Sequence, residues 1–266
     1  MKTSSKISAD IIATAHAMAD AARIETLRYF RGGALGVENK LAGGFDPVTV
    51  ADRAAETAMR AVLAARRPDD GIMGEEFGAT SGTSGLTWVL DPIDGTRGYL
   101  SGMPTWGVLI SVQSDDGVLF GIIDQPFTGE RFIGGLGYAV WQRADAQRKL
   151  AVRPCRSLEH AILFTTYPEV GKLADAAGFQ AVAKHVQLVR YGADCYAYAL
   201  VALGQIDLVI EAGLQNYDVQ APIAVIEAAG GVVTDWQGGP CWHGGRILAA
   251  GDKAVHAEAL KILRDF

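Results

Sequence analysis

A short apolar strand that ends in two aspartates constrains this chain most strongly. It runs Trp-Val-Leu-Asp-Pro-Ile-Asp-Gly-Thr over residues 88–96. Residues 88–91 are mostly apolar and predict the last residues of a buried strand. Gly95 predicts a turn into the next element. Asp91 and Asp94 lie three positions apart, with a proline between them that shapes the backbone, so both can face one point in space. Carboxylate oxygens are the ligands that hard divalent cations such as Mg²⁺ prefer.

Two further acidic segments extend this candidate metal site. Glu75 and Glu76 form a second acidic pair upstream, and Asp218 lies far downstream. Bridging carboxylates can hold two ions ~3.5–4 Å apart. At this spacing the ions can stabilise both the attacking and the leaving oxygen of a phosphoryl displacement. The strand-end pair alone could equally be an ordinary turn, where Asp and Pro are common. Together the three acidic segments favour a metal-dependent phosphatase.

Four segments together resemble the inositol monophosphatase family of Mg²⁺-dependent, lithium-sensitive phosphomonoesterases. In chain order they are D-P-V-T-V-A-D at 46–52, G-E-E at 74–76, D-P-I-D-G-T at 91–96, and Tyr217-Asp218 followed by E-A-A-G-G at 227–231. Tyr217 stands where the family usually has Trp, but an aromatic remains, so the adjacent aspartate is expected to keep its place. The resemblance implies an α+β and α/β fold, a layered αβαβα sandwich with the site at the junction of two subdomains.

The resemblance also implies which residues bind Mg²⁺. Two or three ions are expected on the carboxylates and one carbonyl of this set: Glu75, Asp91, the Ile93 carbonyl, Asp94 and Asp218. Asp218 can alternatively be the N-cap of a helix predicted over 219–229, and both roles are compatible because a carboxylate has two oxygens. For Glu76 a solvated acid, and for Lys40 a surface lysine, are the simpler interpretations.

Catalysis and phosphate binding are expected from a second set of residues. The resemblance implies that the Thr96 hydroxyl, hydrogen-bonded to Asp52, helps Glu75 to orient and deprotonate the attacking water. Residues 49–52 are alternatively a capping box, in which a first-turn acid is common without catalysis. Gly95 and Thr96 are expected to bind the phosphate, because a helical turn that starts there offers unpaired backbone N–H groups to an anion.

Substrate choice is assigned to two acids outside these sets. Asp194 and Glu211 match family positions that contact the substrate beyond its phosphate, although Asp194 can alternatively cap a helix predicted over 194–203. Two acids there suit a leaving group that carries a cation, and histidinol phosphate carries an ammonium and an imidazole. Three strings also resemble the histidinol-phosphatase branch of the family: residues 74–78, 124–131 and 191–198.

The predicted reaction is therefore hydrolysis of L-histidinol phosphate, a step of histidine biosynthesis, by direct attack of a metal-activated water. Inositol 1-phosphate is the main alternative substrate, and nucleotide 3′-phosphates or sugar bisphosphates come next. A catalytically silent metal-binding relative is the non-enzymatic alternative, against which the complete acidic set argues. A phospho-aspartyl intermediate is disfavoured because two residues, not one, separate Asp91 from Asp94.

Composition limits the binding partners and the cellular compartment that can be expected for this chain. A formal net charge of −6 over 266 residues argues against a nucleic-acid surface. The apolar runs are short and broken by glycine, so no membrane span is expected. The three cysteines are scattered and lack metal-like spacing, which favours reduced thiols in the cytoplasm.

The chain is expected to divide near residue 150. Residues 1–150 predict an α+β subdomain, in which helices over 7–31 and 50–66 cover a largely antiparallel sheet. Residues 151–266 alternate helical and strand patterns, as in an α/β subdomain, and include a helix expected over 169–178. The resemblance implies a homodimer, with the loop 98–104 and Trp106 as a candidate contact or as a cover for the subdomain junction.

Overall fold

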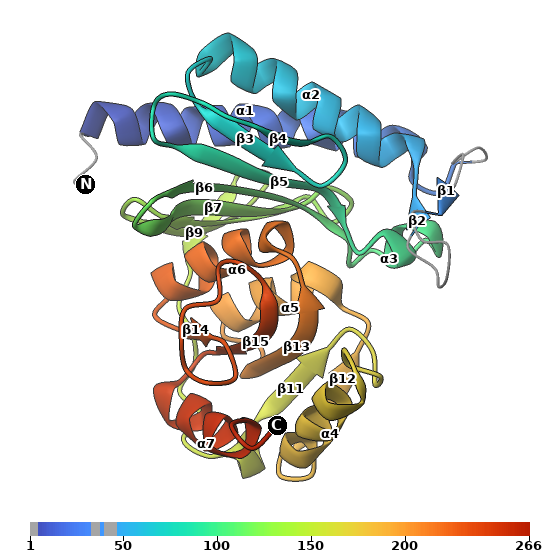
Figure 1. Cartoon of the computed structure of the whole chain (residues 1–266), viewed down its shortest axis with the longest axis vertical. Helices are drawn as coiled ribbons and strands as arrows, with labels where there is room; N and C mark the ends of the chain where they lie inside the picture. Colours follow the sequence, from blue (N-terminus) through green and yellow to red (C-terminus); the bar gives the residue numbers. More distant parts are fainter. Residues whose placement is uncertain (1–4, 33–37, 40–46) are drawn as a thin grey trace.

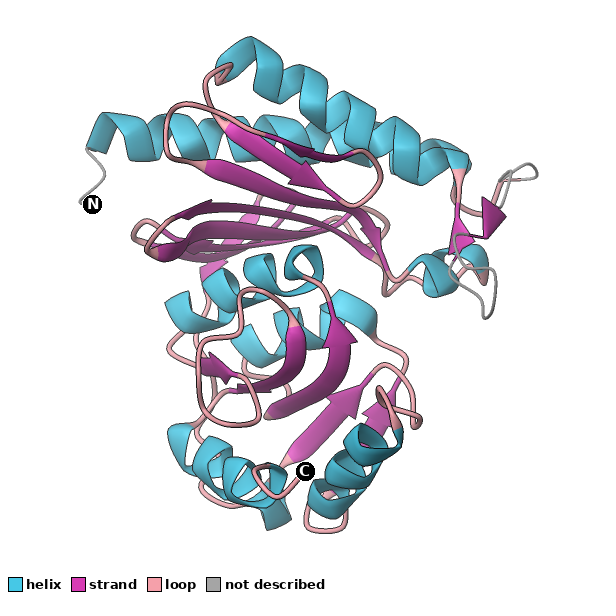
Figure 2. Cartoon of the chain, viewed as in Figure 1, coloured by secondary structure: helices cyan, strands magenta, loops and turns pink. Residues whose placement is uncertain are grey.

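The computed structural model describes residues 5–32, 38–39 and 47–266, and its layers follow the expected αβαβα order (Figure 1). One helix pair lies outside each sheet and one lies between the two sheets (Figure 2). The pairs are α1 (Ser5–Tyr29) with α2 (Val50–Arg66), α5 (Asp194–Ala202) with α6 (Asn216–Ala228), and α4 (Leu173–Ala183) with α7 (Lys253–Leu263). Short elements complete the chain: β1 (Glu38–Asn39), β2 (Pro47–Val48), α3 (Thr96–Leu100) and the 3-10 helix η1 (Leu158–His160).

The first helix pair forms as its sequence predicts. In α1 the apolar positions Ile11, Ala15, Met18 and Ala22 recur at helical spacing, and all four are fully buried. Helix α2 begins at Val50 because Thr49 caps it. The Thr49 hydroxyl accepts a hydrogen bond from the Ala51 amide at 3.1 Å. The two helices therefore cover one face of the larger sheet.

The larger sheet has eight strands and is antiparallel except where β3 pairs with β5. Its strand order is β10-β9-β8-β7-β6-β5-β3-β4. The strands are β3 (Gly71–Gly74), β4 (Gly78–Thr80), β5 (Thr87–Asp94), β6 (Gly107–Ser114), β7 (Gly117–Gln125), β8 (Glu130–Gly135), β9 (Tyr138–Arg143) and β10 (Ala146–Lys149). The sequence did not predict β4 and β10, because both are short, exposed edge strands without an apolar face.

The smaller sheet has five strands in the order β12-β11-β13-β15-β14. They are β11 (Ile162–Thr165), β12 (Leu188–Tyr191), β13 (Leu208–Leu214), β14 (Val232–Thr234) and β15 (Gly245–Ala250). Helix α4 starts at Leu173, four residues later than the expected 169, where Asp175 in the first turn accepts the Lys172 amide at 2.7 Å. Gly171, with φ of 55°, lies in the left-handed region just before it.

Helices α5 and α6 share a core with both sheets. Leu109 and Phe132 of the larger sheet pack in one cluster with Val209 of the smaller sheet. Gly134 lets α6 approach closely, since a Cβ there would lie 2.3 Å from the carbonyl oxygen of Ala224. This close packing places the N-termini of α5 and α6 beside the end of β5. Among the described residues, every helix is too short or too polar to cross a lipid bilayer.

Candidate active site

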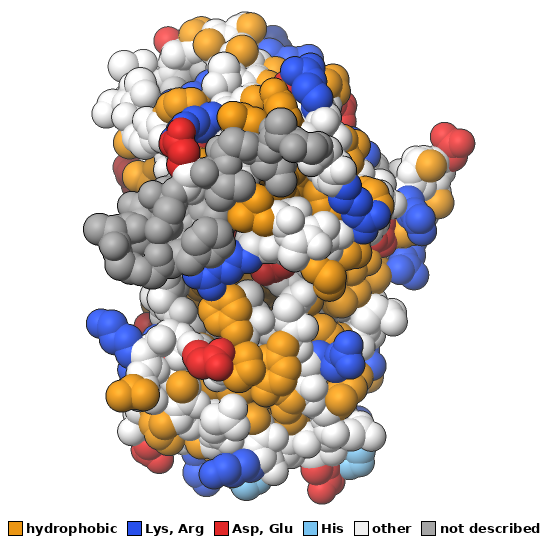
Figure 3. All heavy atoms as spheres, turned by 90° about the vertical axis from the view of Figure 1, so that its right-hand side faces the viewer, with side chains coloured by type: hydrophobic (Ala, Val, Ile, Leu, Met, Phe, Trp, Pro, Cys, Tyr) orange, Lys and Arg blue, Asp and Glu red, His pale blue; other side chains and the backbone are white. Residues whose placement is uncertain are grey.

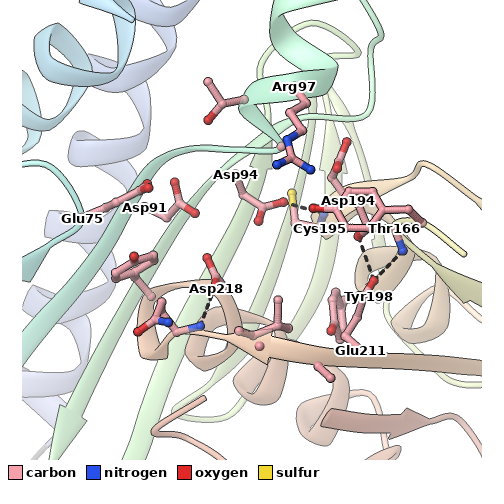
Figure 4. Close-up of a pocket in the computed structure, with 18 of the residues that line it drawn as sticks. Glu75, Asp91, Asp94, Arg97, Thr166, Asp194, Cys195, Tyr198, Glu211 and Asp218 are labelled. Carbon is pink, nitrogen blue, oxygen red and sulfur yellow. Dashed lines mark hydrogen bonds between the residues drawn. The ribbon is translucent and has the colours of Figure 1, made fainter. Parts of the chain in front are cut away.

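A cavity of about 370 Å³ lies where the end of β5 meets the N-termini of α5 and α6 (Figure 4). The segment after β3, helix α3 and the ends of β11 and β13 complete its wall. On the molecular surface acidic atoms are recessed in a hollow between the two halves of the molecule (Figure 3). All the acids expected to bind metal or substrate line this cavity, and the expected catalytic acid Asp52 does not: the six are Glu75, Asp91, Asp94, Asp194, Glu211 and Asp218.

A bulge in β5 brings its two aspartates to one side. Asp91 pairs with Leu109 and Asp94 pairs with Gly107, so three steps on β5 match two steps on β6. Side chains alternate along a regular strand, and residues three apart would point to opposite faces. The extra residue removes that alternation. The Ile93 amide donates to Asp91 Oδ1 at 3.0 Å, which stabilises the bulged backbone.

Asp218 joins this pair from the first turn of α6. Ligand oxygens of Asp91, Asp94 and Asp218 all lie within 4.8 Å of one another. The expected N-cap role of Asp218 was wrong in detail, because α6 starts at Asn216 and its N-cap is Gln215. Asp218 is the third helical residue, and its Oδ2 accepts the Gln215 amide at 2.6 Å in a capping box. A carboxylate that caps with one oxygen keeps the other for a ligand.

The electrostatics of this cluster fit a divalent cation. Burial, followed by the charges of Glu75, Asp94 and Asp218, raises the pKa of Asp91 well above its usual range. Burial and then the charges of Asp194 and Asp218 do the same for Asp94. Crowded, buried carboxylates disfavour their own ionisation, and bound positive charge relieves that repulsion. An all-oxygen donor set of this kind matches the preference of Mg²⁺.

Glu75 lies in a turn that a buried carboxylate of α2 holds. Glu56, which is 0% exposed, accepts the amides of Glu76 at 2.7 Å and Phe77 at 3.2 Å. Arg60 Nε donates to the same carboxylate at 2.8 Å. Gly74 leaves the room that this contact needs, because a Cβ there would lie 1.9 Å from Glu56 Oε1. Sequence reasoning missed Glu56, whose signal is the four-residue spacing from Asp52 and Arg60 on one helix face.

Asp52 forms the capping box that its sequence allowed. Its Oδ2 accepts the Thr49 amide at 2.8 Å and the Thr49 hydroxyl at 2.6 Å. Burial raises the pKa of Asp52 to about 6, and the charge of Glu75 adds to this rise. The expected Thr96–Asp52 hydrogen bond was wrong: the Thr96 hydroxyl donates to the Ile93 carbonyl at 3.1 Å. Gly95, with φ of 82°, turns the chain back on itself and brings that carbonyl within reach.

The comparisons identify the family to which this site belongs. The model of the inositol monophosphatase family matches residues 8–265. The chain belongs to the inositol monophosphatase family. It is 37% identical over 262 residues to the chloroplastic "bifunctional phosphatase IMPL2" of Arabidopsis thaliana, covering 94% of this chain and 74% of that protein.

Two other relatives cover nearly the whole chain. A histidinol-phosphatase of Mycobacterium tuberculosis is 33% identical over 257 residues, covering 96% of this chain and 98% of the relative. The solved structure of an inositol monophosphatase from Zymomonas mobilis has a TM-score of 0.83 and 34% identity, covering 99% and 100%. Fold and family are thus shown, and this family consists of phosphatases.

In this family member the two expected substrate acids lie on the far side of the cavity from Glu75 (Figure 4). Glu211 Oε1 accepts the Thr166 amide at 2.7 Å and the Thr166 hydroxyl at 2.8 Å, and burial raises the pKa of Glu211 to about 7. Asp194 is not an N-cap, because Ala193 occupies that position and Asp194 is the first helical residue, with φ of 45°. Its Oδ2 accepts the Thr105 hydroxyl at 3.1 Å.

Sequence reasoning missed several other cavity residues. The Arg97 guanidinium lies 5.2 Å from the ring centroid of Tyr167. Burial raises the pKa of Asp194, against the opposing effects of the Thr105 hydrogen bond and the Arg97 charge. The Cys195 amide donates to Asp94 Oδ2 at 2.6 Å and thereby orients this carboxylate. Arg97 directly follows the D-G-T motif, which was a usable signal, whereas Thr166 had none.

The remaining candidate residues have other positions. Lys40 and Asp46 lie outside the described residues. Glu76 contributes its amide to Glu56. Trp106 is fully buried beside Phe30, with 5.1 Å between the ring centroids, in a cluster whose other members all come from residues 30–99, so it is not available as an exposed dimer contact.

Proposed function

We propose that this protein is a Mg²⁺-dependent phosphomonoesterase that hydrolyses L-histidinol phosphate to L-histidinol and phosphate in histidine biosynthesis. One observation carries the proposal: the carboxylate cluster of Asp91, Asp94 and Asp218 shares its cavity with Asp194 and Glu211. The first group suits metal and phosphate, and the second suits a cationic leaving group.

Glu75, Asp91, the Ile93 carbonyl, Asp94 and Asp218 would hold two or three Mg²⁺ ions. Bound there, the ions supply positive charge for the phosphate and acidify a water molecule. The protein orients these groups beforehand: the Cys195 amide fixes Asp94, and the turn that Glu56 holds fixes Glu75. Rigid orientation of metal ligands by their neighbours raises affinity and activity.

The chain's own residues also handle the proton and the phosphate. Glu75 is proposed as the group that accepts a proton from water, with Asp52 as its electrostatic neighbour. Since the pKa of Asp52 is about 6, this carboxylate is mostly ionised above pH 7. The backbone N–H groups at Gly95 and Thr96 are proposed to bind the phosphate, with the Thr96 hydroxyl oriented by the Ile93 carbonyl.

A charge count favours a cationic leaving group. Six carboxylates and one guanidinium, that of Arg97, are among the described residues that line the cavity. Two Mg²⁺ ions would balance four carboxylates, which leaves Asp194 and Glu211 facing Arg97. One negative charge then lacks a partner even before the charge of the phosphate is counted, and the ammonium of histidinol phosphate supplies a positive partner. The histidinol-phosphatase of M. tuberculosis, 33% identical, supports this choice.

Inositol 1-phosphate is the second candidate substrate, which the Z. mobilis inositol monophosphatase supports. The test compares kcat/KM for the two esters under saturating Mg²⁺. We expect at least a ~10-fold preference for histidinol phosphate, the effect of one charge-assisted hydrogen bond. Equal values, or a preference for inositol 1-phosphate, would contradict the proposed substrate.

We extend the proposal to a cytoplasmic homodimer that lithium inhibits and that binds neither nucleic acid nor membrane. The net charge of −6 argues against binding to nucleic acid. The three cysteines are free and buried, which supports a reducing compartment such as the cytoplasm. Light scattering at micromolar concentration checks the dimer, and a monomeric mass contradicts it. Titration with LiCl checks inhibition.

A further inference from the structure

Tyr198 has a buried hydroxyl in the cavity wall that the proposed mechanism does not use. It lies four residues after Asp194 on α5, and both residues line the cavity. Its side chain is 4% exposed and lines the cavity beside Glu211 and Thr166 (Figure 4). Among the described residues its hydroxyl has no hydrogen-bond partner.

An unpaired phenol is unusual at this depth. Buried tyrosine hydroxyls nearly always find a partner, because an unmade hydrogen bond leaves the cost of desolvation uncompensated. An exception therefore points to a partner from outside the chain, either an ordered water or a bound ligand, and the position of Tyr198 in the cavity wall favours a ligand. Burial, and then the charges of Glu211, Asp94 and Asp218, keep the pKa of Tyr198 well above its ordinary value. The hydroxyl thus remains a neutral donor at physiological pH.

Tyr196, two residues earlier on the same helix, shows what a structural phenol looks like in this protein. Its hydroxyl donates to Glu130 Oε2 at 2.7 Å, and Trp141 donates to the other oxygen of that carboxylate at 2.9 Å. Tyr196 therefore anchors α5 to the larger sheet. Tyr198 faces the cavity and has no such anchor among the described residues.

We propose that Tyr198 is a substrate-binding residue whose hydroxyl donates a hydrogen bond to the leaving group of the phosphate ester. This inference rests on the proposed function for the identity of that group. Tyr198 offers a donor, and Glu211, when ionised, offers an acceptor beside it. A neutral imidazole presents the complementary pair, one bare nitrogen and one N–H. The two side chains would therefore recognise the ring of histidinol phosphate on the side of the cavity opposite Glu75 (Figure 4).

The test compares Tyr198→Phe with Tyr196→Phe as a matched control. Each change removes one oxygen from α5. The substrates are histidinol phosphate and phenyl phosphate, whose leaving group has no acceptor beyond the ester oxygen. For Tyr198→Phe we expect the ratio of the two kcat/KM values to fall roughly 3- to 10-fold, the effect of one neutral hydrogen bond. The fall should come from KM for histidinol phosphate, and the Tm should stay level or rise, because the lost hydroxyl had no partner.

Tyr196→Phe should lower the Tm and leave the substrate ratio as in the wild type. A Tm loss in Tyr198→Phe equal to that of the control, failure of Tyr198→Phe to fold, or an unchanged substrate ratio would each overturn the inference. If the wild type does not hydrolyse histidinol phosphate, the proposed substrate fails separately. The same ratio measured with inositol 1-phosphate then decides the role of Tyr198: a fall supports it, and no change overturns it.

Discussion

Replacing Glu56 by glutamine perturbs the support of Glu75 without touching any proposed metal ligand. The glutamine keeps the shape of the side chain but exchanges one acceptor oxygen for an NH₂ group. Glu56 accepts two backbone amides and the Arg60 guanidinium, so at least one of these donors must lose its partner. The turn that carries Glu75 should then relax.

The size of the effect follows from these contacts. A buried donor left without a partner costs about 1–3 kcal/mol, and loss of the charge weakens the remaining bonds. The Arg60 pair contributes to this cost as well, since the Glu56 side chain is 0% exposed and the Arg60 side chain only 21% exposed. We expect a loss of about 2–4 kcal/mol, which lowers Tm by ~4–16 °C in a chain of this size. Loss of such a supporting contact also weakens metal binding by ~10- to 100-fold.

Two measurements check this expectation: thermal unfolding without metal, and the Mg²⁺ concentration that gives half-maximal activity. Glu258→Gln is the matched control, since Glu258 Oε2 accepts the Leu158 amide at 2.9 Å outside the cavity. The control should leave the half-maximal Mg²⁺ concentration unchanged. A Glu56→Gln variant with wild-type Mg²⁺ dependence would refute the positioning role, and an unchanged Tm would refute the hydrogen-bond reasoning.

Four further outcomes are expected. Asp94→Asn should lower kcat by more than about 100-fold under Mg²⁺, and retention of most activity would contradict the site. Asp194→Ala should reduce kcat/KM for histidinol phosphate far more than for phenyl phosphate, whereas equal losses would make Asp194 structural. Gly95→Ala should cost at least ~1–2 kcal/mol in unfolding free energy, since φ is 82° and a Cβ would lie 2.6 Å from Asp194 Cγ. Because burial raises the pKa of Glu211 from 4.5 to about 7, the folded state binds the extra proton, and stability without metal should fall as pH rises from ~4.5 to ~7. Glu211→Gln should flatten that slope in denaturant titrations, and an unchanged slope would refute this assignment.

Local sequence signals predicted most of the fold. Helix α2 begins and ends at the expected residues 50 and 66, because a capping box and a regular apolar spacing coincide there. Helix α6 starts three residues before the expected 219, since its N-cap is Gln215, a residue outside the common cap types. A common N-cap residue such as Thr49 therefore allowed the helix start to be predicted correctly, and an uncommon one such as Gln215 did not.

The acids of the site could be named from the sequence, but their contacts could not. The carboxylate of Glu56 meets amides twenty residues away, and Glu211 meets Thr166 across forty-five residues. Such contacts depend on how β3 and β11 lie beside their neighbours, which no local pattern specifies. The bulge between Asp91 and Asp94 is likewise visible only in the pairing of β5 with β6.

Diffraction from crystals grown with Mn²⁺, which replaces Mg²⁺ and scatters anomalously, tests most directly whether these acids form a metal centre. The expected result is an anomalous difference peak within bonding distance of carboxylate oxygens of Asp91, Asp94 and Asp218. Glu75 should lie beside this peak. Crystals that bind Mn²⁺ elsewhere, with these carboxylates turned apart and no density between them, would contradict the metal centre and the phosphatase mechanism built on it.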